Sequence, residues 1–237
     1  MRHMFILFLL FAFPARAEMN AELARDHVDI STGFNGETIA LFGTTDEENA
    51  EIIISIKGPE TTIAVRKKGR VLGAWMNKDT VEFRRVPAYY DIASTYAPSE
   101  EFAKEHEIGF GNLDFYAENE SEPEVIAVFK NALIIKMQTK GFVPEEAKKV
   151  KRIDAHFFKT TFILPPDIPT GLYTVDTYVV RDDKLLGHES RKLQVGQVGF
   201  NANVYMTAQE HSLFYGLFTV FVALISGWSA FTFLRRD

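Results

Sequence analysis

The clearest chemical signal in the sequence is a short basic run, Arg66-Lys67-Lys68 followed by Arg70, in a chain of formal net charge −6. Closely spaced guanidinium and ammonium groups bind anionic ligands or acidic protein surfaces. We expect the run to lie at a hairpin turn centred on residues 67–69. The same charges could instead keep that turn solvated and stop a sheet edge from aggregating. Arg66, Lys67 and Arg70 are therefore candidate binding residues, with the solvated turn as the alternative.

A second candidate site is the segment 87–96, which contains Tyr89 and Tyr90 and follows Trp75 along the chain. Aromatic and small polar side chains on a loop are typical of recognition surfaces. The same tyrosines could instead attach neighbouring elements to each other. We keep both interpretations and count Trp75, Tyr89 and Tyr90 as candidate binding residues.

No sequence pattern indicates a catalytic or metal site. The six histidines fall in no metal-ligand spacing, and Glu105-His106-Glu107 would place adjacent side chains on different faces of a helix. The sequence has neither a phosphate-binding glycine loop nor a G-x-S-x-G elbow. We expect no enzymatic activity and no cofactor, although distant residues could still assemble a catalytic triad.

The composition narrows the function further. The chain has no cysteine, which excludes disulfides, thiol redox chemistry and thiolate metal ligands. Its acidity argues against a nucleic-acid partner. If the chain is exported, the lack of disulfides favours the envelope of a Gram-negative bacterium over a eukaryotic cell surface.

The first 17 residues have the pattern of a secretory signal peptide. A basic start is followed by the apolar stretch Met4–Phe13 and by the cleavage signal Ala15-Arg16-Ala17. We predict that residues 1–17 are removed and that the domain formed by residues 18–211 lies in the periplasm. An uncleaved N-terminal anchor is the alternative.

Residues 212–234 carry no charge and predict a transmembrane helix. Twenty-three helical residues extend roughly 34 Å, which is enough to cross a bilayer. Arg235 and Arg236 follow directly, so we place residues 235–237 in the cytoplasm. The sequence thus predicts a single-pass protein of the bacterial inner membrane.

Small residues recur along one stripe of this predicted helix, at Gly216, Ala223, Gly227 and Ala230. Small side chains let two membrane helices approach closely. We expect contact with a helix of another membrane protein, and the alternative is a stripe that faces lipid.

The rest of the chain is predicted to be mainly β, an immunoglobulin-like sandwich built from residues 26–97 and 155–198. The sandwich pattern consists of short strands joined by turns, including a near-continuous β-branched strand at 51–57 and a hairpin turn at Asn35-Gly36. An α-helical insertion at about 98–154 separates the two parts. Two separate domains are the alternative.

Three helices are expected in the insertion. A helix over 99–108 begins at a serine cap, and a longer one over 122–140 has an apolar face and ends before Gly141. A third, over 144–152, begins with acidic residues and ends with basic ones, which matches the helix dipole.

Several phrases of the sequence resemble a family of uncharacterised transmembrane proteins of alphaproteobacteria. These phrases are Phe34–Gly43 (FNGETIALFG), Ile54–Pro59 (ISIKGP), Val65–Lys68 (VRKK), Gly73–Asn77 (GAWMN), Val86–Tyr90 (VPAYY), Ala93–Thr95 (AST), Leu164-Pro165, Gly171–Tyr173 (GLY), Tyr215–Leu217 (YGL) and Gly227-Trp228. Members of that family often lie in genomes beside sulfite-exporter-like permeases, so the resemblance implies an accessory role. It supplies no site residues.

Taken together, these patterns predict a membrane-anchored periplasmic accessory or interaction protein that binds a membrane-protein partner. A periplasmic protein that binds a small ligand or an anion is the main alternative, and an enzyme is the third.

Overall fold

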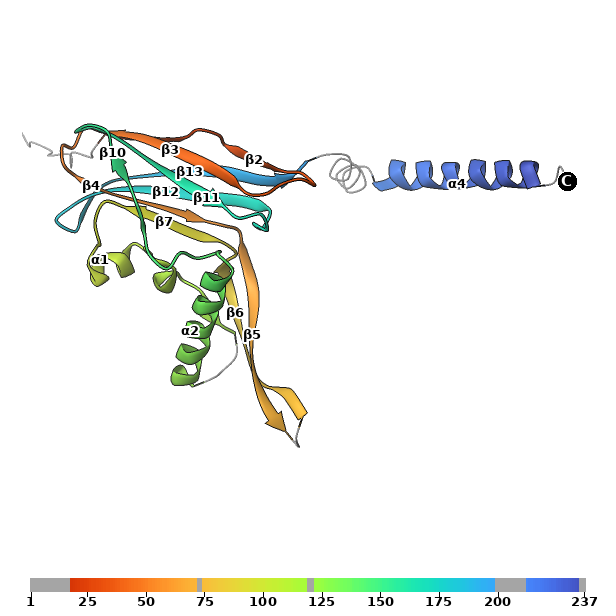
Figure 1. The fold of residues 1–237 in the computed structure, drawn as a ribbon, viewed down its shortest axis with the longest axis horizontal. Coiled ribbons are helices and arrows are strands. Elements are labelled where there is room, and N and C mark those ends of the chain that lie inside the picture. The colour runs from red at the N-terminus through yellow and green to blue at the C-terminus, as the bar shows by residue number, and fades with distance from the viewer. Residues whose placement is uncertain (1–17, 72–73, 119–121, 199–211, 235–237) are drawn as a thin grey trace, which may run out of the picture.

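The computed structural model describes residues 18–71, 74–118, 122–198 and 212–234. Two β-sheets face each other at the top of the molecule as drawn in Figure 1. The first sheet has the order β1-β3-β11-β10, formed by Met19–Leu23, Glu37–Thr45, Phe157–Leu164 and Lys151–Arg152. The second has the order β2-β13-β12-β4-β7-β9, formed by His27–Ile30, Lys184–Gln197, Gly171–Arg181, Glu51–Lys57, Tyr90–Ser94 and Lys148–Lys149.

This strand order is that of an immunoglobulin variable-type sandwich. Chain order assigns β1, β3, β11 and β10 to strands A, B, E and D, and β2, β13, β12, β4 and β7 to strands A′, G, F, C and C′. Strand β2 pairs in parallel with β13, and β4 pairs antiparallel with both β12 and β7. The hydroxyl of Tyr173, near the start of β12, donates to the Pro169 carbonyl oxygen at 2.6 Å, which is the tyrosine corner of this architecture. The predicted mainly β sandwich is confirmed.

The core lies between the two sheets because alternate residues of each strand point inward. Leu41 of β3 and Phe162 of β11 are fully buried against Val175 and Val179 of β12 within one apolar cluster. Strand β4 is buried on both faces, as its continuous β-branched run predicts. Its Ile52, Ile54 and Ile56 belong to the main core, and Ile53 packs in a second cluster on the outer side of the sheet.

That outer side is covered by a short helical segment. Helix α1 spans Glu100–Glu105 and is capped by the Ser99 hydroxyl, and the 3-10 helix η1 spans Phe110–Asn112. Phe102 of α1 packs with Ile53 and with Tyr178 of β12. The helix predicted over 99–108 is therefore confirmed and holds the insertion against the sandwich.

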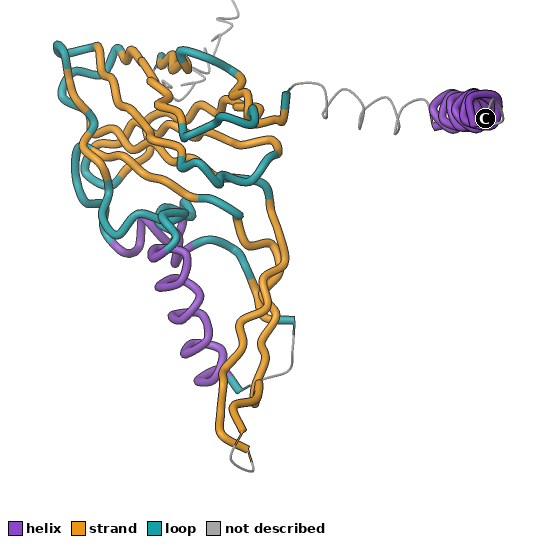
Figure 2. Tube along the Cα trace, turned by 45° about the vertical axis from the view of Figure 1, so that its right-hand side comes forward, coloured by secondary structure: helices purple, strands orange, loops and turns teal. Residues whose placement is uncertain are grey.

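A long hairpin with a helix beside it projects from the sandwich, as Figures 1 and 2 show. It consists of β5 (Glu60–Val71), β6 (Ala74–Pro87), the two-residue strand β8 (Tyr116–Ala117) and helix α2 (Pro123–Thr139). We call these four elements the arm. Phe129, Leu133 and Met137 of α2 are buried in the same cluster as Val81 and Phe83 of β6. The arm is therefore continuous with the main core. Its strands β5 and β6 follow β4 and precede β7 in the chain, whereas β8 and α2 follow β7. The sequence predicts β5 and β6 to be strands of the sandwich, but they belong to a separate sheet.

Two local predictions are wrong. The helix predicted over 144–152 is replaced by the edge strands β9 and β10, with Val150 buried between them. Lys148 and Lys149 pair in parallel with Ala93 and Ser94 of β7, so sheet pairing outweighs the favourable helix-dipole pattern.

The predicted hairpin about Asn35-Gly36 is also wrong, because β2 and β3 lie in different sheets. Gly36 does adopt the expected positive φ, +89°. A Cβ at that position would come within 2.6 Å of the Leu164 carbonyl oxygen, so the crossing between sheets requires glycine there.

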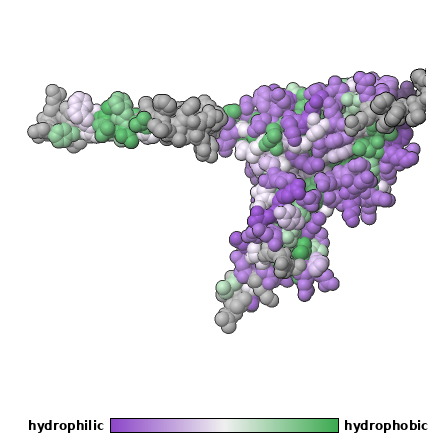
Figure 3. All heavy atoms as spheres, turned by 180° about the vertical axis from the view of Figure 1, so that it is seen from behind, coloured by the Kyte–Doolittle hydropathy of each residue, from purple (hydrophilic) through white to green (hydrophobic). Residues whose placement is uncertain are grey.

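The C-terminal helix α4 forms over Ser212–Leu234, the predicted range. Its described side chains are mostly apolar and exposed, and Figure 3 shows hydrophobic atoms on this helix in contrast to the largely hydrophilic sandwich. The prediction of a transmembrane helix is nevertheless corrected. No helix in the described part of the chain meets the length and hydropathy needed to cross a bilayer.

The helix contact predicted at Gly216, Ala223, Gly227 and Ala230 stays a prediction. Among described residues, Ser226 donates its hydroxyl to the Val222 carbonyl oxygen of its own helix at 2.8 Å. No side chain lies within 4 Å of a Cβ placed on Gly216 or Gly227, and Ala223 is exposed. The side chain of Ala230, the signal peptide at 1–17 and the tail at 235–237 lie outside the described residues. The single-pass periplasmic topology is therefore without support in the structure.

Candidate functional site

The basic run lies on a strand and not at a turn, contrary to the prediction. Strand β5 continues through Lys67-Lys68-Gly69 to Val71, which pairs with Ala74. Arg66 lies opposite Thr80, and Lys67 lies opposite Asp79. Arg66, Lys67, Lys68 and Arg70 are all exposed. Lys67, Lys68 and Arg70 thus lie on the far half of the arm, and Arg66 directly precedes it.

This far half, which we call the distal ribbon, consists of residues 67–71 and 74–79. Among the described residues it has only two strands, because β8 pairs with β6 no further out than Phe83 and Arg84. Figures 1 and 2 show that the ribbon extends past the end of α2. A two-stranded hairpin is marginally stable in water by itself. Within the described chain, the outer edge of β5 is open as well, so the ribbon presents unpaired backbone groups together with its basic side chains.

A groove runs between α2 and the base of the distal ribbon. Val125 and Val128 of α2 are exposed, by 39% and 62%, and face Val81 across it. Lys67, Asp79 and Glu124 form its charged rim. The apolar face predicted for α2 is therefore divided: Phe129 and Leu133 are buried, whereas Val125, Val128 and Ala132 remain exposed. The arm combines an apolar groove with a basic ribbon.

The aromatic candidate residues that the structure describes are buried and do not form an exposed recognition loop. Tyr89 and Tyr90 are only 2% and 1% exposed. The Tyr90 hydroxyl accepts the backbone N–H of Gly109 at 2.7 Å, and the Tyr89 hydroxyl donates to Asp91 Oδ2 at 3.1 Å. Burial raises the pKa of both phenols. These tyrosines attach the insertion to the sandwich, which was the alternative interpretation, and the side chain of Trp75 lies outside the described residues.

The sequence did not indicate one buried ion pair, which joins Asp91 and Lys148. The side chain of Asp91 is 4% exposed, and its Oδ2 lies 2.5 Å from Lys148 Nζ. Asp91 Oδ1 also accepts the backbone N–H of Ile92 at 2.9 Å. With both carboxylate oxygens satisfied, the pair joins β7 to the edge strand β9 and has a structural role.

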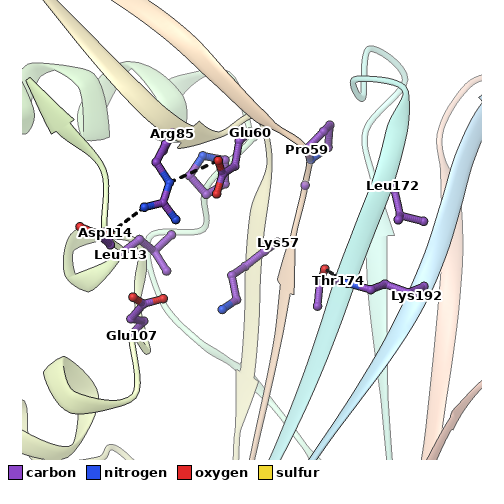
Figure 4. Close-up of a pocket in the computed structure, with 12 residues that line it drawn as sticks. Lys57, Pro59, Glu60, Arg85, Glu107, Leu113, Asp114, Leu172, Thr174 and Lys192 are labelled. Carbon is purple, nitrogen blue, oxygen red and sulfur yellow. Dashed lines mark hydrogen bonds and ion pairs between the residues drawn. The ribbon is translucent and has the colours of Figure 1, made fainter. Parts of the chain in front are cut away.

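A second candidate site lies where the arm meets the second sheet. It is a cleft of about 390 Å³, shown in Figure 4. Its lining is Lys57, Gly58, Pro59, Glu60, Arg85, Pro87, Glu107, Leu113, Asp114, Leu172, Thr174 and Lys192. These residues come from β4, β5, β6, β12, β13 and the segment after α1, so no local pattern could predict the cleft.

Ion pairs fix most of the charges of this cleft. Arg85 Nη1 lies 2.9 Å from Asp114 Oδ2, and Arg85 Nε lies 3.4 Å from Glu60 Oε2. The hydrogen bond and charge of Glu60, with the charge of Asp114, raise the pKa of the guanidinium. Lys57 Nζ lies 3.2 Å from Asp176 Oδ2 just behind the cleft.

The backbone of Arg85 is unusual. Between the pairs Thr61–Val86 and Ile63–Phe83, β6 carries one residue more than β5, which forms a bulge. Arg85 sits in it with φ +59°. Positive φ costs a bulky residue about 1–3 kcal/mol and persists only where surrounding contacts impose it. Here the bulge directs the guanidinium toward Glu60 and Asp114.

The described residues contain no group of three or more His, Cys, Asp or Glu arranged to hold a metal ion. These residues instead form two candidate binding surfaces. One is the basic ribbon beside the apolar groove on the arm, and the other is the polar cleft at the base of the arm.

These features define a β-sandwich protein with a projecting arm. The chain belongs to the family described as "Putative transmembrane protein (Alph_Pro_TM)", whose model matches residues 18–236. The resemblance seen in the sequence is thereby confirmed, and the family name describes membrane proteins. A comparison with curated proteins found no match.

Among solved structures, the chain is similar to domain 1 of VCBP3 from Branchiostoma floridae. The two share 11% identity, and the alignment covers 78% of this chain and 98% of that chain at a TM-score of 0.31. A score this low supports no argument about fold or function.

Proposed function

We propose that this is an interaction protein without catalytic activity, and that its arm binds an acidic surface of a partner protein. The observation that carries the proposal is the distal ribbon, which in the described part of the chain is a two-stranded extension with an open edge. It carries three exposed basic side chains, Lys67, Lys68 and Arg70, and the exposed Arg66 directly precedes it. The family resemblance implies that the partner is a membrane transporter, and we include that in the proposal.

The distal ribbon gains little stability from its own two strands. Ordering a ribbon beyond the end of α2 costs chain entropy, and an isolated pair of strands recovers little of it. A partner that pairs with the open edge of β5 would supply backbone hydrogen bonds, as in other complexes formed by strand addition. Exposed apolar groups at Val125 and Val128 would add buried area at the base of the same surface.

The positive charge of the ribbon favours an acidic protein as the partner. Arg66, Lys67, Lys68 and Arg70 concentrate positive charge on a chain that is acidic as a whole. Two copies joined through their β5 edges would bring these cations together, which disfavours self-association. An acidic edge or loop of another protein fits the ribbon better.

The test places a photo-crosslinking amino acid at residue 68 of the full-length chain in native membranes. We expect a discrete crosslinked partner, which Arg66→Glu, Lys67→Glu and Arg70→Glu together should abolish. The matched control is Lys149→Glu, Lys151→Glu and Lys184→Glu, which changes the net charge equally at exposed lysines outside the arm. The control should retain the crosslink.

Salt supplies an independent check. Recovery of the partner should fall as ionic strength rises and should lose that dependence in the arm triple variant. If the arm triple and the control triple behave alike, with equal folding by circular dichroism, the ribbon is a solvated edge and the proposal is wrong.

A further inference from the structure

We propose that the cleft between the second sheet and the base of the arm binds a small zwitterionic molecule, one that carries both an amine and a carboxylate. The binding site is independent of the partner surface proposed for the distal ribbon. The proposal rests on backbone strain, on the placement of charges and on the size of the cleft.

Two residues that line this cleft have a left-handed backbone conformation, which is rare for their residue types. Five described residues other than glycine have positive φ: Asn49, Arg85, Glu107, Asp182 and Asp183. Asn and Asp adopt that conformation readily, whereas Arg and Glu do so rarely. Arg85 and Glu107, with φ of +59° and +52°, both line the cleft. Strained residues cluster at ligand sites because the strain holds a side chain where binding needs it.

Glu107 occupies a position that ordinarily favours glycine. Helix α1 ends in a Schellman motif, in which the N–H of Ile108 donates to the Ala103 carbonyl and the N–H of Glu107 donates to the Lys104 carbonyl. The residue at the Glu107 position of this motif is left-handed and is usually glycine. A glutamate there loses stability that glycine would recover, so a function of its carboxylate explains its presence.

Apart from Arg85, which is paired with Glu60 and Asp114, Figure 4 shows the acidic residues Glu107 and Asp114 on one side of the cleft and the lysines on the other. Lys57 of β4 and Lys192 of β13 come from the sheet, and Glu107 and Asp114 come from the insertion. Lys192 Nζ has a neutral partner, the Thr174 hydroxyl at 2.8 Å. The Glu107 carboxylate makes no hydrogen bond or ion pair with the described residues. A cation on one wall and an anion on the other are thus left to bind groups of a ligand.

The size and the remaining lining agree with a small polar ligand. A volume of about 390 Å³ is at the lower end of the roughly 300–1,000 Å³ of small-molecule sites. Pro59, Leu113 and Leu172 contribute apolar surface between the charged groups. A short methylene chain between an amine and a carboxylate would contact it. We infer that the amine binds at Glu107 and the carboxylate at Lys192.

The test measures binding to the purified full-length chain by isothermal titration calorimetry. The probes are β-alanine, γ-aminobutyrate, 6-aminohexanoate and 8-aminooctanoate, in which the separation of the two charges increases stepwise. Hexylamine and hexanoate carry one charge each and serve as matched probes. We expect an optimum along the amino acid series and affinity at least about tenfold above both single-charge probes.

Two variants separate binding from folding. Glu107→Gly should raise Tm by about 2–4 °C, because it relieves the left-handed strain, and should weaken binding of the best probe at least about tenfold. Lys192→Gln should weaken binding similarly without changing Tm. Lys184→Gln and Glu105→Gln, at exposed positions outside the cleft, should change neither.

Three results would overturn the proposal. In the first, no amino acid of the series binds at millimolar concentration. In the second, hexanoate binds as tightly as the best amino acid, which would make the cleft a simple anion site. In the third, binding survives unchanged in both Glu107→Gly and Lys192→Gln. None of these results affects the crosslinking test of the ribbon, so the two proposals can fail separately.

Discussion

The sandwich and the arm are both built on paired β-strands, but the strands of the sandwich are more fully paired and covered than those of the arm. In the sandwich, β4 and β12 are each paired on both sides and contribute residues with almost no exposure, such as Ile54 and Val179. In the described part of the arm, β5 pairs along one edge only, and the hairpin extends past the end of α2 (Figure 2). Local opening should therefore cost little in the distal ribbon and much in the sandwich. This contrast is the reason that we place the proposed binding surfaces on or beside the arm.

The largest effect that sharpens this comparison is expected from Phe162→Ala in β11. Phe162 is fully buried between the sheets, and its removal should lower the free energy of unfolding by about 4 kcal/mol. Chemical denaturation measures the effect. Phe42→Ala is the control, because Phe42 is 39% exposed on the outer side of the neighbouring strand. Equal losses for the two variants would show that the core is not where the structure places it.

Phe129→Ala in α2 should have a smaller effect, about 3 kcal/mol, because the arm can partly collapse into the cavity. Phe129 is 5% exposed and lines the groove. Val128→Ala, on the exposed side of the helix, should cost less than about 0.5 kcal/mol. An unchanged denaturation midpoint for Phe129→Ala would mean that α2 does not pack on the hairpin.

A steric test comes next in size. A Cβ on Gly43 of β3 would lie 2.2 Å from the Phe158 ring, so Gly43→Ala should cost about 2 kcal/mol through overpacking. Gly196→Ala is the control, since no atom of the described residues lies within 4 Å of the added methyl group. If thermal unfolding shows the two variants to be equally stable, the close contact of the glycine with the aromatic ring is absent.

The smallest effect concerns the distal ribbon. Lys67→Ala and Lys68→Ala should each change stability by no more than about 0.5 kcal/mol. Amide hydrogens of residues 67–71 should exchange much faster than those of β4 and β12, measured by hydrogen–deuterium exchange of the full-length chain. Protection in the free ribbon equal to that of β4 would remove the stability argument for a binding partner. Added protection on partner binding would strengthen it.

Some of the fold could be predicted because its causes are local. The strand at 51–57 has the predicted bounds, because a continuous β-branched run is stable only where both faces are covered. Gly141 has φ +73° at the end of α2, as a glycine after a helix predicts. The family could be identified because its phrases are spread over nearly the whole matched region, residues 18–236.

Other features depended on contacts between distant segments. The pattern over 144–152 suits a helix, yet β7 offers an open edge and the segment pairs with it. The basic run resembles a turn, but the strands extend past it to Val71 and Ala74, since register is set by cross-strand pairs and not by the presence of a glycine. Nothing in the sequence around Tyr89 and Tyr90 distinguishes an exposed recognition loop from a buried contact between two elements.

The sequence by itself determined the β-rich class, the α2 region and the basic character of residues 66–70, because period and charge are properties of neighbouring residues. Only the tertiary structure decided that those charges project on an arm and that Lys57, Arg85, Glu107 and Lys192 share one cleft. These four residues span 135 positions of the chain. Chain folding alone brings such residues together, and it does so through the pairing of β4, β12 and β13 and the bulge in β6, none of which a local pattern encodes.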